Sequence, residues 1–547
     1  MQIFDNQFFM GKSCTPLFFL LFIAGILSSN CRNAASVSSG SKIKPGQYTE
    51  PHRPQFHFSP EKMWMNDPNG MVYFQGEYHF FYQYYPGANV WGPMHWAHAV
   101  STDLVHWEHL PIALYPDSMG YIFSGSAVVD WQNTSGFGKE GQAPLVAMYT
   151  IHDMKAEKAG SLEYESQGIA FSNDRGRTWT KYAANPVIPN PGKQRDFRDP
   201  KLIWVDGSKQ WVAVLAVKDH AEFWGSKDLK SWQYLSDFGK EYGEHGGVWE
   251  CPDFFPMTVE PSGEQKWVLV QNLNPGSPNG GSGTQYFVGD FDGKNFTLDA
   301  SFVPSVSRGK AVWLDYGRDN YAGVTWSDVP KSDGRRLLMG WMSNWDYATV
   351  TPTEVWRSAT TLPRTLNLIK KPEGYRLRVQ PVRELESLRI KSIELKPADM
   401  PASLDLSGKL GFSPALSEME LTFELPESAS GSFGVELSNS KNERYRIGYD
   451  AGKNQFFSDR TKAGNASFSD KFAAGIHVAP RFSKDKTVHL HLFFDVASAE
   501  MFADKGETVM TDIFFPGEDF NKLRLFAEGG KVKLAKGRIY QLKSIWR

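Results

Sequence analysis

At residues 101–107 the chain reads Ser-Thr-Asp-Leu-Val-His-Trp, a polar Ser-x-Asp turn that leads to a tryptophan. The pattern returns at residues 172–179, Ser-Asn-Asp-Arg-Gly-Arg-Thr-Trp, and at residues 226–232, Ser-Lys-Asp-Leu-Lys-Ser-Trp. The three tryptophans are therefore 72 and 53 positions apart. Units of roughly 40 to 70 residues built from short strands are typical of propeller blades.

The sequence around these repeats is that of an all-β protein. From Phe56 to Leu377, short runs of β-branched and aromatic residues alternate with Gly, Pro, Asn and Asp, and no amphipathic helix stands out. About 320 residues at this spacing make five blades. We therefore predict a five-bladed β-propeller over residues 51–380.

The composition changes at residues 383–386, Arg-Glu-Leu-Glu, within a predicted linker at 381–392. Beyond it, segments such as 419–425 (Met-Glu-Leu-Thr-Phe-Glu-Leu) alternate apolar and polar residues, as strands with one wet face do. A run of such strands predicts a β-sandwich over residues 393–547. We expect this second domain to be structural.

The start of the chain has the pattern of an export signal. Lys12 precedes an apolar run at 17–27, which is too short for a stable membrane span, so we predict a signal peptide at 1–31 and a Ser/Gly-rich tether at 32–50. Residues 27–31, Leu-Ser-Ser-Asn-Cys, resemble a bacterial lipoprotein box, although Asn30 departs from the usual small residue. A lipid anchor at Cys31 and simple secretion both stay open. The predicted location is secreted, periplasmic or a bacterial cell surface.

Charge and cysteine content exclude several classes of function. The chain has 59 Lys and Arg against 61 Asp and Glu, so it has no basic excess with which to bind nucleic acid. After the leader only Cys31 and Cys251 remain, which makes a disulfide framework improbable, and no Cys/His cluster has zinc spacing. We expect His95, His98 and His106 to be structural, and we predict no metal site.

Three acidic residues share one local context. Asp67 lies in Trp-Met-Asn-Asp-Pro-Asn-Gly, Asp199 in Asp-Phe-Arg-Asp-Pro-Lys, and Glu250 in Val-Trp-Glu-Cys-Pro-Asp. In each segment a proline follows within two residues and an apolar strand begins soon after, so the acids are expected at rigid strand entrances. Corresponding strand ends of different propeller blades converge on one axial cavity.

Convergent carboxylates next to aromatic residues are suited to glycosidic cleavage. One ionised carboxylate must face the anomeric carbon while a protonated one donates to the leaving oxygen. Arg198, beside Asp199, is a candidate for the cation that keeps one carboxylate ionised. The alternative is that the Asp-Pro and Asn-Gly pairs merely form turns.

In matching order and spacing, these segments resemble glycoside hydrolase family 32, the fructan hydrolases and invertases, over nearly all of the mature chain. The resemblance implies a propeller followed by a β-sandwich, with Asp67 as nucleophile, Glu250 as acid/base and Asp199 as transition-state stabiliser. Arg198 would orient the sugar. Retention of configuration implies carboxyl groups of Asp67 and Glu250 about 5 to 5.5 Å apart. No cofactor is implied.

The resemblance extends to further contacts with the terminal fructose. Those residues are Asn66, Gln83, Trp91, Phe123 and Ser124, with Trp313 and Trp341 as candidates for the aromatic wall. Cys251 is implied to be a pocket residue and not a nucleophile.

The expected activity is release of fructose from the non-reducing ends of levan or inulin, and from sucrose. Segments 90–96, 274–287 and 313–316 most resemble exo-acting members of the family. An endo-levanase that yields fructo-oligosaccharides stays open, as does a non-catalytic fructan-binding protein on the cell surface. Loop contacts beyond the terminal sugar decide between β-2,6 and β-2,1 linkages, and the sequence does not predict the oligomeric state.

Overall fold

The computed structural model describes residues 47–192, 194–426 and 430–546. The predicted signal peptide, Cys31 and the tether as far as residue 46 lie outside the described residues. Strands dominate, which confirms the all-β prediction, and none of the helices in the described ranges is long and apolar enough to cross a membrane. The helical segments are α1 (Met154–Lys158), α2 (Ser407–Leu410), η1 (Val303–Ser305), η2 (Ala348–Val350), η3 (Arg383–Leu388) and η4 (Asp504–Gly506).

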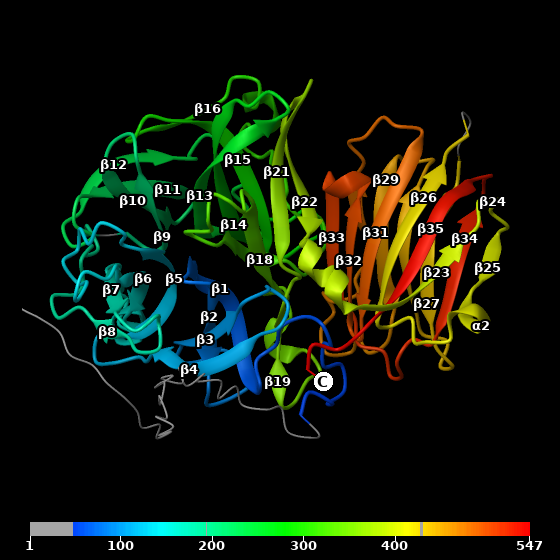
Figure 1. The fold of residues 1–547 in the computed structure, drawn as a ribbon, viewed down its shortest axis with the longest axis horizontal. Coiled ribbons are helices and arrows are strands. Elements are labelled where there is room, and N and C mark those ends of the chain that lie inside the picture. The colour runs from blue at the N-terminus through cyan, green and yellow to red at the C-terminus, as the bar shows by residue number, and fades with distance from the viewer. Residues whose placement is uncertain (1–46, 193, 427–429, 547) are drawn as a thin grey trace, which may run out of the picture. The chain divides into compact units, whose positions relative to one another are not determined.

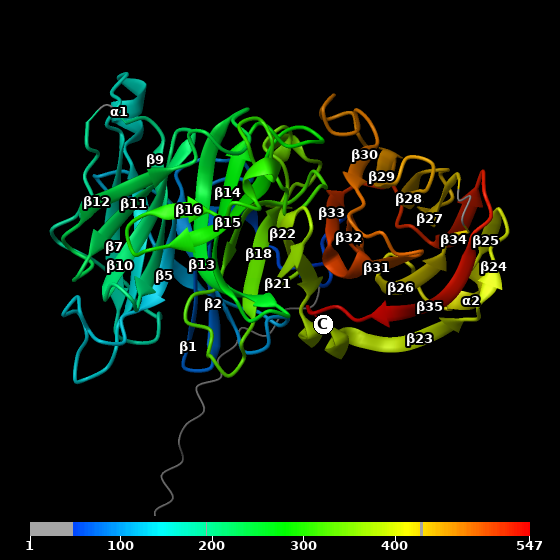
Figure 2. The same ribbon diagram turned by 90° about the horizontal axis from the view of Figure 1, so that it is seen from above.

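The first half of the chain forms antiparallel meanders (Figures 1 and 2). The first sheet holds β1 (Met63–Phe74), β2 (Glu77–Tyr85), β3 (His95–Ser101), β4 (Glu108–Leu114) and, parallel to β1, β19 (Trp356–Arg357). The second holds β5 (Tyr121–Val129), β6 (Leu145–His152), β7 (Glu165–Ser172) and β8 (Thr180–Lys181). The third holds β9 (Phe197–Val205), β10 (Gln210–Val217), β11 (His220–Ser226) and β12 (Gln233–Phe238).

A larger sheet follows, in which a further meander pairs with a final group of strands. The meander is β13 (Val248–Glu260), β14 (Gln265–Asn274), β15 (Gly283–Phe291) and β16 (Phe296–Leu298). The final group is β17 (Tyr321–Thr325), β18 (Arg336–Met342), β20 (Ala359–Thr360), β21 (Arg364–Lys371) and β22 (Gly374–Pro381), with β21 parallel to β13.

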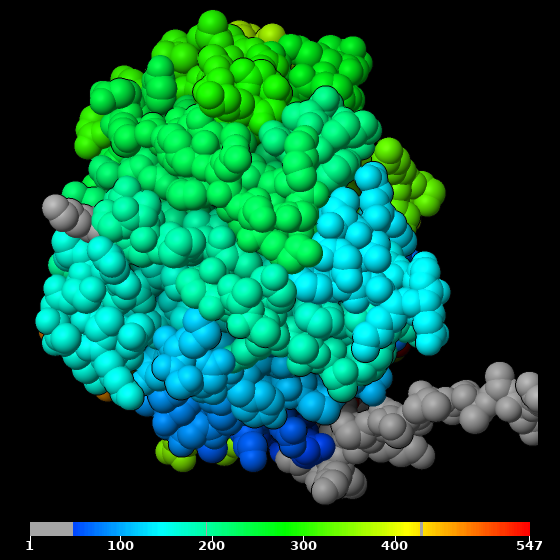
Figure 3. Space-filling model, turned by 90° about the vertical axis from the view of Figure 1, so that its left-hand side faces the viewer, coloured from blue at the N-terminus to red at the C-terminus, as the bar shows by residue number. Residues whose placement is uncertain are grey.

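The first strands of these meanders form a closed ring. β1 contacts β5, β5 contacts β9, β9 contacts β13, β13 contacts β17, and β17 returns to β1. This closed arrangement around one axis is that of a β-propeller. Figure 3 shows the side of the molecule on which the cyan to green segments lie, which are the sheets of β5 to β16.

The Ser-x-Asp repeats join the third strand of a sheet to its fourth. In the β3–β4 turn, Asp103 Oδ1 accepts hydrogen bonds from the backbone N–H groups of Val105 and His106 at 3.0 and 2.8 Å. In the β11–β12 turn, Asp228 Oδ1 accepts the equivalent pair at 2.9 and 2.7 Å. The repeat is thus turn chemistry in which a side chain satisfies the backbone.

The second half of the chain forms two facing sheets. One holds β23 (Arg389–Leu395), β24 (Ala398–Asp399), β26 (Ser417–Glu424), β31 (Thr487–Asp495), β32 (Ser498–Ala503), β33 (Thr508–Ile513) and β35 (Lys533–Leu542). The other holds β25 (Ser403–Asp405), β27 (Ser432–Ser438), β28 (Arg444–Asp450), β29 (Gln455–Lys462), β30 (His477–Pro480) and β34 (Lys522–Glu528). Apolar residues of both sheets, such as Leu490 and Leu525, share one core, as in a β-sandwich. The predicted linker at 381–392 contains η3 and the start of β23.

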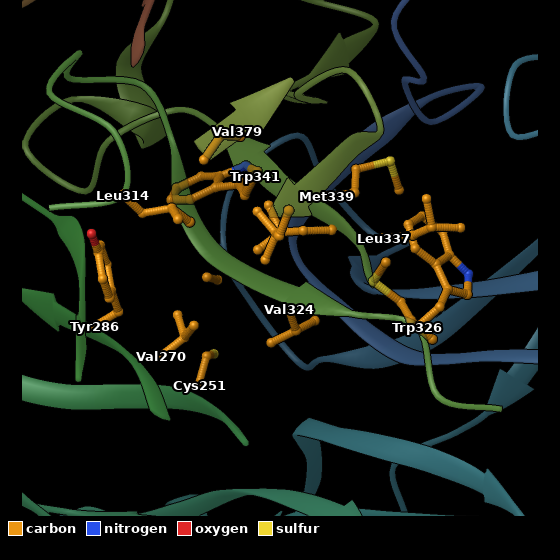
Figure 4. Close-up of a cluster of buried hydrophobic side chains, with 14 of the residues drawn as sticks. Cys251, Val270, Tyr286, Leu314, Val324, Trp326, Leu337, Met339, Trp341 and Val379 are labelled. Carbon is orange, nitrogen blue, oxygen red and sulfur yellow. The ribbon is translucent and has the colours of Figure 1, made fainter. Parts of the chain in front are cut away.

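Two kinds of packing hold these parts together. Val324, Leu337, Met339 and Trp341 of the propeller belong to one buried apolar cluster (Figure 4), which also contains Phe493 and Phe502 of the sandwich. A buried charge network joins the propeller to the sandwich. His57 Nδ1 lies 2.8 Å from Asp495 Oδ2 and its Nε2 lies 2.9 Å from Glu500 Oε1, while Arg364 also bonds Glu500 at 2.6 Å.

Candidate active site

The side chains of the candidate site come from bulges in the ring strands. In β1 the pairing register shifts between Met65 and Pro68, and in β5, β9, β13 and β17 similar shifts lie close to the first residues. A bulge breaks the regular alternation of a strand and turns side chains that would otherwise face a neighbouring sheet. Asp67, Ser124, Asp199 and Glu250 all lie in or beside these shifts.

These bulges explain why the sequence motifs contain prolines. Pro68, Pro200 and Pro252 have no N–H to give to a neighbouring strand, and a central strand accepts proline only where the ladder is interrupted. The backbone is also unusual here, because Asp199 has φ +62° and Cys251 has φ +42°. Positive φ is uncommon for residues other than glycine and gathers at functional sites.

The bulges open into a cavity of about 240 Å³. Its lining includes every substrate or catalytic residue predicted from sequence except the two tryptophans of the aromatic wall. The lining residues are Asn66, Asp67, Gln83, Trp91, Phe123, Ser124, His152, Glu157, Tyr164, Glu165, Asp196, Arg198, Asp199, Glu250 and Trp345. The three predicted catalytic carboxyl groups therefore share one cavity.

Of the three predicted catalytic carboxyl groups, Asp67 has the most side-chain hydrogen-bond donors around its oxygens. Ser124 Oγ donates to Oδ2 at 2.7 Å and Asn66 Nδ2 donates to Oδ1 at 3.0 Å. The Cys251 thiol also lies 3.4 Å from Oδ2. Burial raises the pKa of Asp67, and these three donors oppose that rise because they favour the ionised form.

Glu250 lies between a cation and a phenol. Arg198 Nη2 donates to its Oε1 at 3.1 Å, and the Tyr321 hydroxyl donates to its Oε2. Burial raises the pKa of Glu250, while the charge of Arg198 opposes the rise. A carboxyl group with a raised pKa keeps its proton to higher pH, which suits a general acid.

Asp199 is held rigidly from two sides. Its Oδ2 accepts a hydrogen bond from the backbone N–H of Cys251 at 2.9 Å, and its own N–H donates to Thr150 Oγ1 at 2.8 Å. Burial, together with the nearby negative charges of Glu250 and Asp67, raises the pKa of Asp199 to about 8. Three carboxyl groups so close together do not all ionise at neutral pH.

Arg198 is the cation of this cluster. Its Nη1 donates to Asp196 Oδ1 at 2.8 Å and lies 3.2 Å from Glu165 Oε1, and its Nε is 3.9 Å from Asp199 Oδ2. These acids raise the pKa of Arg198 further, so its charge is permanent. Sequence reasoning missed Glu165 and did not assign Asp196 a role, although Asp196 opens the Asp-Phe-Arg-Asp-Pro motif.

Aromatic rings form part of the cavity wall. Trp91 and Phe123 line it as predicted, and Trp345 and Tyr164 line it as well. Trp341 is fully buried, with its ring centroid 4.9 Å from that of Trp345. Trp313 is partly buried between the propeller and sandwich cores and does not line the cavity. A ligand contact by Trp341 would therefore require Trp345 to move.

Polar groups complete the wall. His152 stacks on Phe123 with centroids 4.1 Å apart, and its Nδ1 lies 3.1 Å from Glu165 Oε1. Gln83 is buried, and its Nε2 has no hydrogen-bond partner among the described residues, which leaves a donor for a ligand. No local motif marked His152, Glu157, Tyr164, Tyr321 or Trp345 in the sequence.

The histidines expected to be structural have protein partners. His98 Nε2 lies 3.1 Å from His79 Nδ1, His95 Nδ1 lies 2.9 Å from the Pro93 carbonyl, and His106 Nδ1 lies 2.8 Å from Asp103 Oδ2. Cys251 is buried, and burial and the surrounding acids raise the pKa of its thiol well above the usual range. A thiol in that state is a poor nucleophile.

Comparison with known proteins places these features in a family. The model "Glycosyl hydrolases family 32 N-terminal domain" matches residues 57–381, and "Glycosyl hydrolases family 32 C terminal" matches residues 384–541. A levanase of Bacillus subtilis (strain 168) is 49% identical over 502 residues, which cover 91% of this chain and 72% of that protein. An extracellular exo-inulinase of Aspergillus awamori is 40% identical over 531 residues, covering 91% and 96%.

Solved structures give the same relationship. The crystal structure of exo-inulinase from Aspergillus awamori aligns with a TM-score of 0.82 at 38% identity, covering 91% of this chain and all of that one. A fructofuranosidase from Schwanniomyces occidentalis, complexed with fructosylnystose, aligns with a TM-score of 0.80 at 33% identity, covering 92% and 100%.

Proposed function

Because the chain belongs to glycosyl hydrolase family 32, we propose that it is a retaining hydrolase that releases fructose from the non-reducing ends of fructans and from sucrose. One observation carries the proposal. Asp67, Asp199 and Glu250, from three different ring strands, line one cavity. The levanase, exo-inulinase and fructofuranosidase relatives support fructosyl substrates.

In the first step, a carboxylate oxygen of Asp67 attacks the anomeric carbon of the terminal fructosyl unit. Glu250 gives its proton to the glycosidic oxygen, the bond between that oxygen and the anomeric carbon breaks, and the shortened chain or glucose leaves. Burial raises the pKa of both carboxyl groups. The side-chain donors around Asp67 favour its attacking, ionised form, and the raised pKa of Glu250 favours its proton-donating form.

In the second step, Glu250 is ionised and acts as a base. It takes a proton from water, the water oxygen attacks the anomeric carbon, and the ester to Asp67 breaks with its electrons returning to the carboxylate. Two inversions give net retention. Arg198 stabilises ionised Glu250 in the interval between the steps, since it bonds that carboxylate directly.

Asp199 and Arg198 orient the sugar. In the empty site Asp199 keeps a proton near neutral pH, so it has both a donor and acceptors for the fructose hydroxyls. The partial positive charge of an oxocarbenium-like transition state also favours nearby carboxylates. We assign to Asn66, Gln83, Trp91, Phe123 and Ser124 the remaining contacts with the terminal fructose, and Trp345 joins them.

Exo action is the mode that we propose. A cavity of about 240 Å³, lined by Trp91, Phe123 and Trp345 among others, suits one terminal sugar better than the interior of a chain. The exo-inulinase relative supports this mode. The endo alternative requires an open cleft at the entrance of the same cavity.

Three structural proposals accompany the activity. The ring of β1, β5, β9, β13 and β17 supports five blades within residues 51–380, with the β-sandwich over 393–547. Export through the 1–31 signal peptide agrees with the extracellular name of one relative. Lipid attachment at Cys31 is a further proposal, and a Cys31→Ser variant tests it because it would move the protein from membranes to the medium.

The test of function is the early product profile on levan, inulin and sucrose. Fructose alone from the first minutes supports exo action, and the relative rates name the preferred linkage. A ladder of fructo-oligosaccharides would replace the exo mode by the endo alternative. No release from any of the three substrates would overturn the proposed function in favour of a binding protein.

A further inference from the structure

A second cavity, of about 540 Å³, lies at the other ends of the same ring strands. Its wall includes Val129 at the end of β5, Trp204 near the end of β9, Phe254 in β13 and Ser327 just after β17. The catalytic residues come from the starts of these strands. The two cavities are therefore separate mouths of one propeller axis, and a cavity of only about 10 Å³, lined by residues such as Pro200 and Cys251, lies between them.

Three tryptophans line this second cavity, of which Trp211 is buried while Trp131 is exposed and Trp204 is half-buried. Trp131 is 62% exposed, and its indole N–H donates to Asp328 Oδ1 at 2.8 Å. Trp204 donates to Asp206 Oδ1 at 3.0 Å and packs edge-on against Trp211, with centroids 5.2 Å apart. Each hydrogen bond fixes the ring before a ligand arrives, so little side-chain entropy is lost on binding.

Arg336 adds unused hydrogen-bond donors. Its guanidinium lies 4.7 Å from the centre of the Phe255 ring and makes one long bond, of 3.4 Å, to the Trp326 carbonyl. No carboxylate oxygen lies within 4.0 Å of it among the described residues. Lys201, in the same wall, is by contrast paired with Asp253 at 2.9 Å. Arg336 therefore has N–H groups free for an acceptor.

We propose that this second cavity binds a segment of a fructan chain without cleaving it. Aromatic faces bury the C–H faces of sugar rings, and the donors of Arg336 and the carboxylate oxygens of Asp206 and Asp328 match sugar hydroxyls. The wall has three acidic residues (Asp130, Asp206 and Asp328) and three basic ones (Lys201, Lys331 and Arg336), so it has no charge excess that would favour an ionic ligand over a neutral one. The choice of fructan rests on the proposed function, whereas the fit to a neutral oligosaccharide does not.

The site acts by holding polymer close to the enzyme. Binding of one chain segment raises the effective concentration of chain ends near the catalytic cavity, an advantage that only a long substrate has. Sucrose is too short to benefit. Disruption of the second site should therefore lower kcat/KM on polymer and leave kcat/KM on sucrose unchanged.

The test compares Trp131→Ala and Arg336→Gln with Tyr234→Ala. Tyr234 is a matched control, since it is 50% exposed on β12 and does not line the cavity. We expect both cavity variants to lose about 5-fold to 10-fold in kcat/KM on high-mass levan or inulin, whichever is cleaved, with sucrose rates unchanged. Polymer kcat/KM within twofold of wild type in both variants would overturn the proposal.

Direct binding separates this proposal from the proposed function. The experiment measures how strongly native gels containing levan, inulin or dextran retard the full chain. It compares the Glu250→Gln variant with the double variant that also carries Trp131→Ala. Weaker retardation after Trp131→Ala supports the second site even if the wild type hydrolyses nothing. Hydrolysis of fructan with retardation unaffected by Trp131→Ala would overturn the second site and leave the proposed function intact.

Discussion

Arg198 Nη2 donates a hydrogen bond to Oε1 of Glu250 at 3.1 Å. The permanent positive charge of Arg198 therefore lies directly beside the proposed general acid. Burial acts in the opposite direction and raises the pKa of Glu250. The protonation state of the acid is thus set by two opposing effects, of which one can be removed by substitution.

Replacing Arg198 by Met is expected to raise the pKa of Glu250, because the opposing cation is lost while burial remains. Since the first step needs protonated Glu250, the alkaline limb of the kcat/KM profile should move to higher pH. The rate at the optimum should fall about 100-fold or more with the loss of a sugar contact. Arg175→Met, at a 45% exposed arginine paired with Glu77, is the control. An unshifted alkaline limb would contradict the role given to Arg198.

Asp67→Asn and Glu250→Gln test the two catalytic roles. Both replacements keep side-chain size, so the fold should be retained, and each should lower kcat on sucrose by at least about 10²-fold to 10⁴-fold. Glu250→Gln should be less damaging on a substrate whose leaving group needs no proton, whereas Asp67→Asn should be equally damaging on both. Near-normal turnover by either variant would refute the assignment.

Cys251→Ala should retain activity within about tenfold. The Asp199 carboxylate receives a hydrogen bond from the backbone N–H of Cys251, which the substitution keeps, and only the weaker thiol contacts with Asp67 and Asp199 are lost. Iodoacetamide should leave the wild-type thiol unmodified, because it is buried and its pKa is raised. Complete loss of activity, as in Asp67→Asn, would instead indicate a chemical role for the thiol.

The titration of the His57 side chain should make the stability of the folded chain depend on pH. Its two carboxylate partners overcome burial and raise its pKa to about 9. A pKa raised on folding gives stability that is complete below the unfolded value of about 6.5 and is lost as pH rises toward 9, by up to about 3 kcal/mol. The difference in unfolding free energy between wild type and His57→Gln should therefore shrink between pH 6 and pH 9.

Thermal or urea unfolding at several pH values measures this difference. His106→Gln is the matched control, since that histidine also bonds an aspartate but is 45% exposed. A difference for His57→Gln that stays constant from pH 6 to pH 9 would show that His57 is not the titrating group.

The acids and their neighbours were predictable because each acid lies in a recognisable local sequence pattern. Asp67, Asp199 and Glu250 precede prolines near the starts of apolar strands, where a bulge accommodates the proline. The turns were predictable for the same kind of reason, since the Asp side chain of each Ser-x-Asp repeat accepts hydrogen bonds from the backbone of its own turn. The β15–β16 turn uses Asp292 alone for this purpose, so the repeat was not visible there.

The rest of the site depends on tertiary packing. Tyr321 reaches Glu250 from a distant strand of the same large sheet, and Glu165 reaches Arg198 from a neighbouring sheet, in both cases without any sequence motif. Trp341 and Trp345 are four residues apart, yet one is buried in β18 and the other follows it and lines the cavity. Sequence composition alone does not distinguish those two positions, because both are aromatic residues beside the same strand.

The central claim is that Asp67 forms a covalent bond to fructose, and trapping that ester tests it most directly. Glu250→Gln is incubated with a fructosyl donor whose leaving group needs no proton, so that the first step proceeds while the second, which needs the base, is slow. Mass spectrometry should find one added fructosyl group, on the peptide that contains Asp67. An adduct on any other residue, or cleavage of the donor with no adduct and with inverted product, would contradict the account.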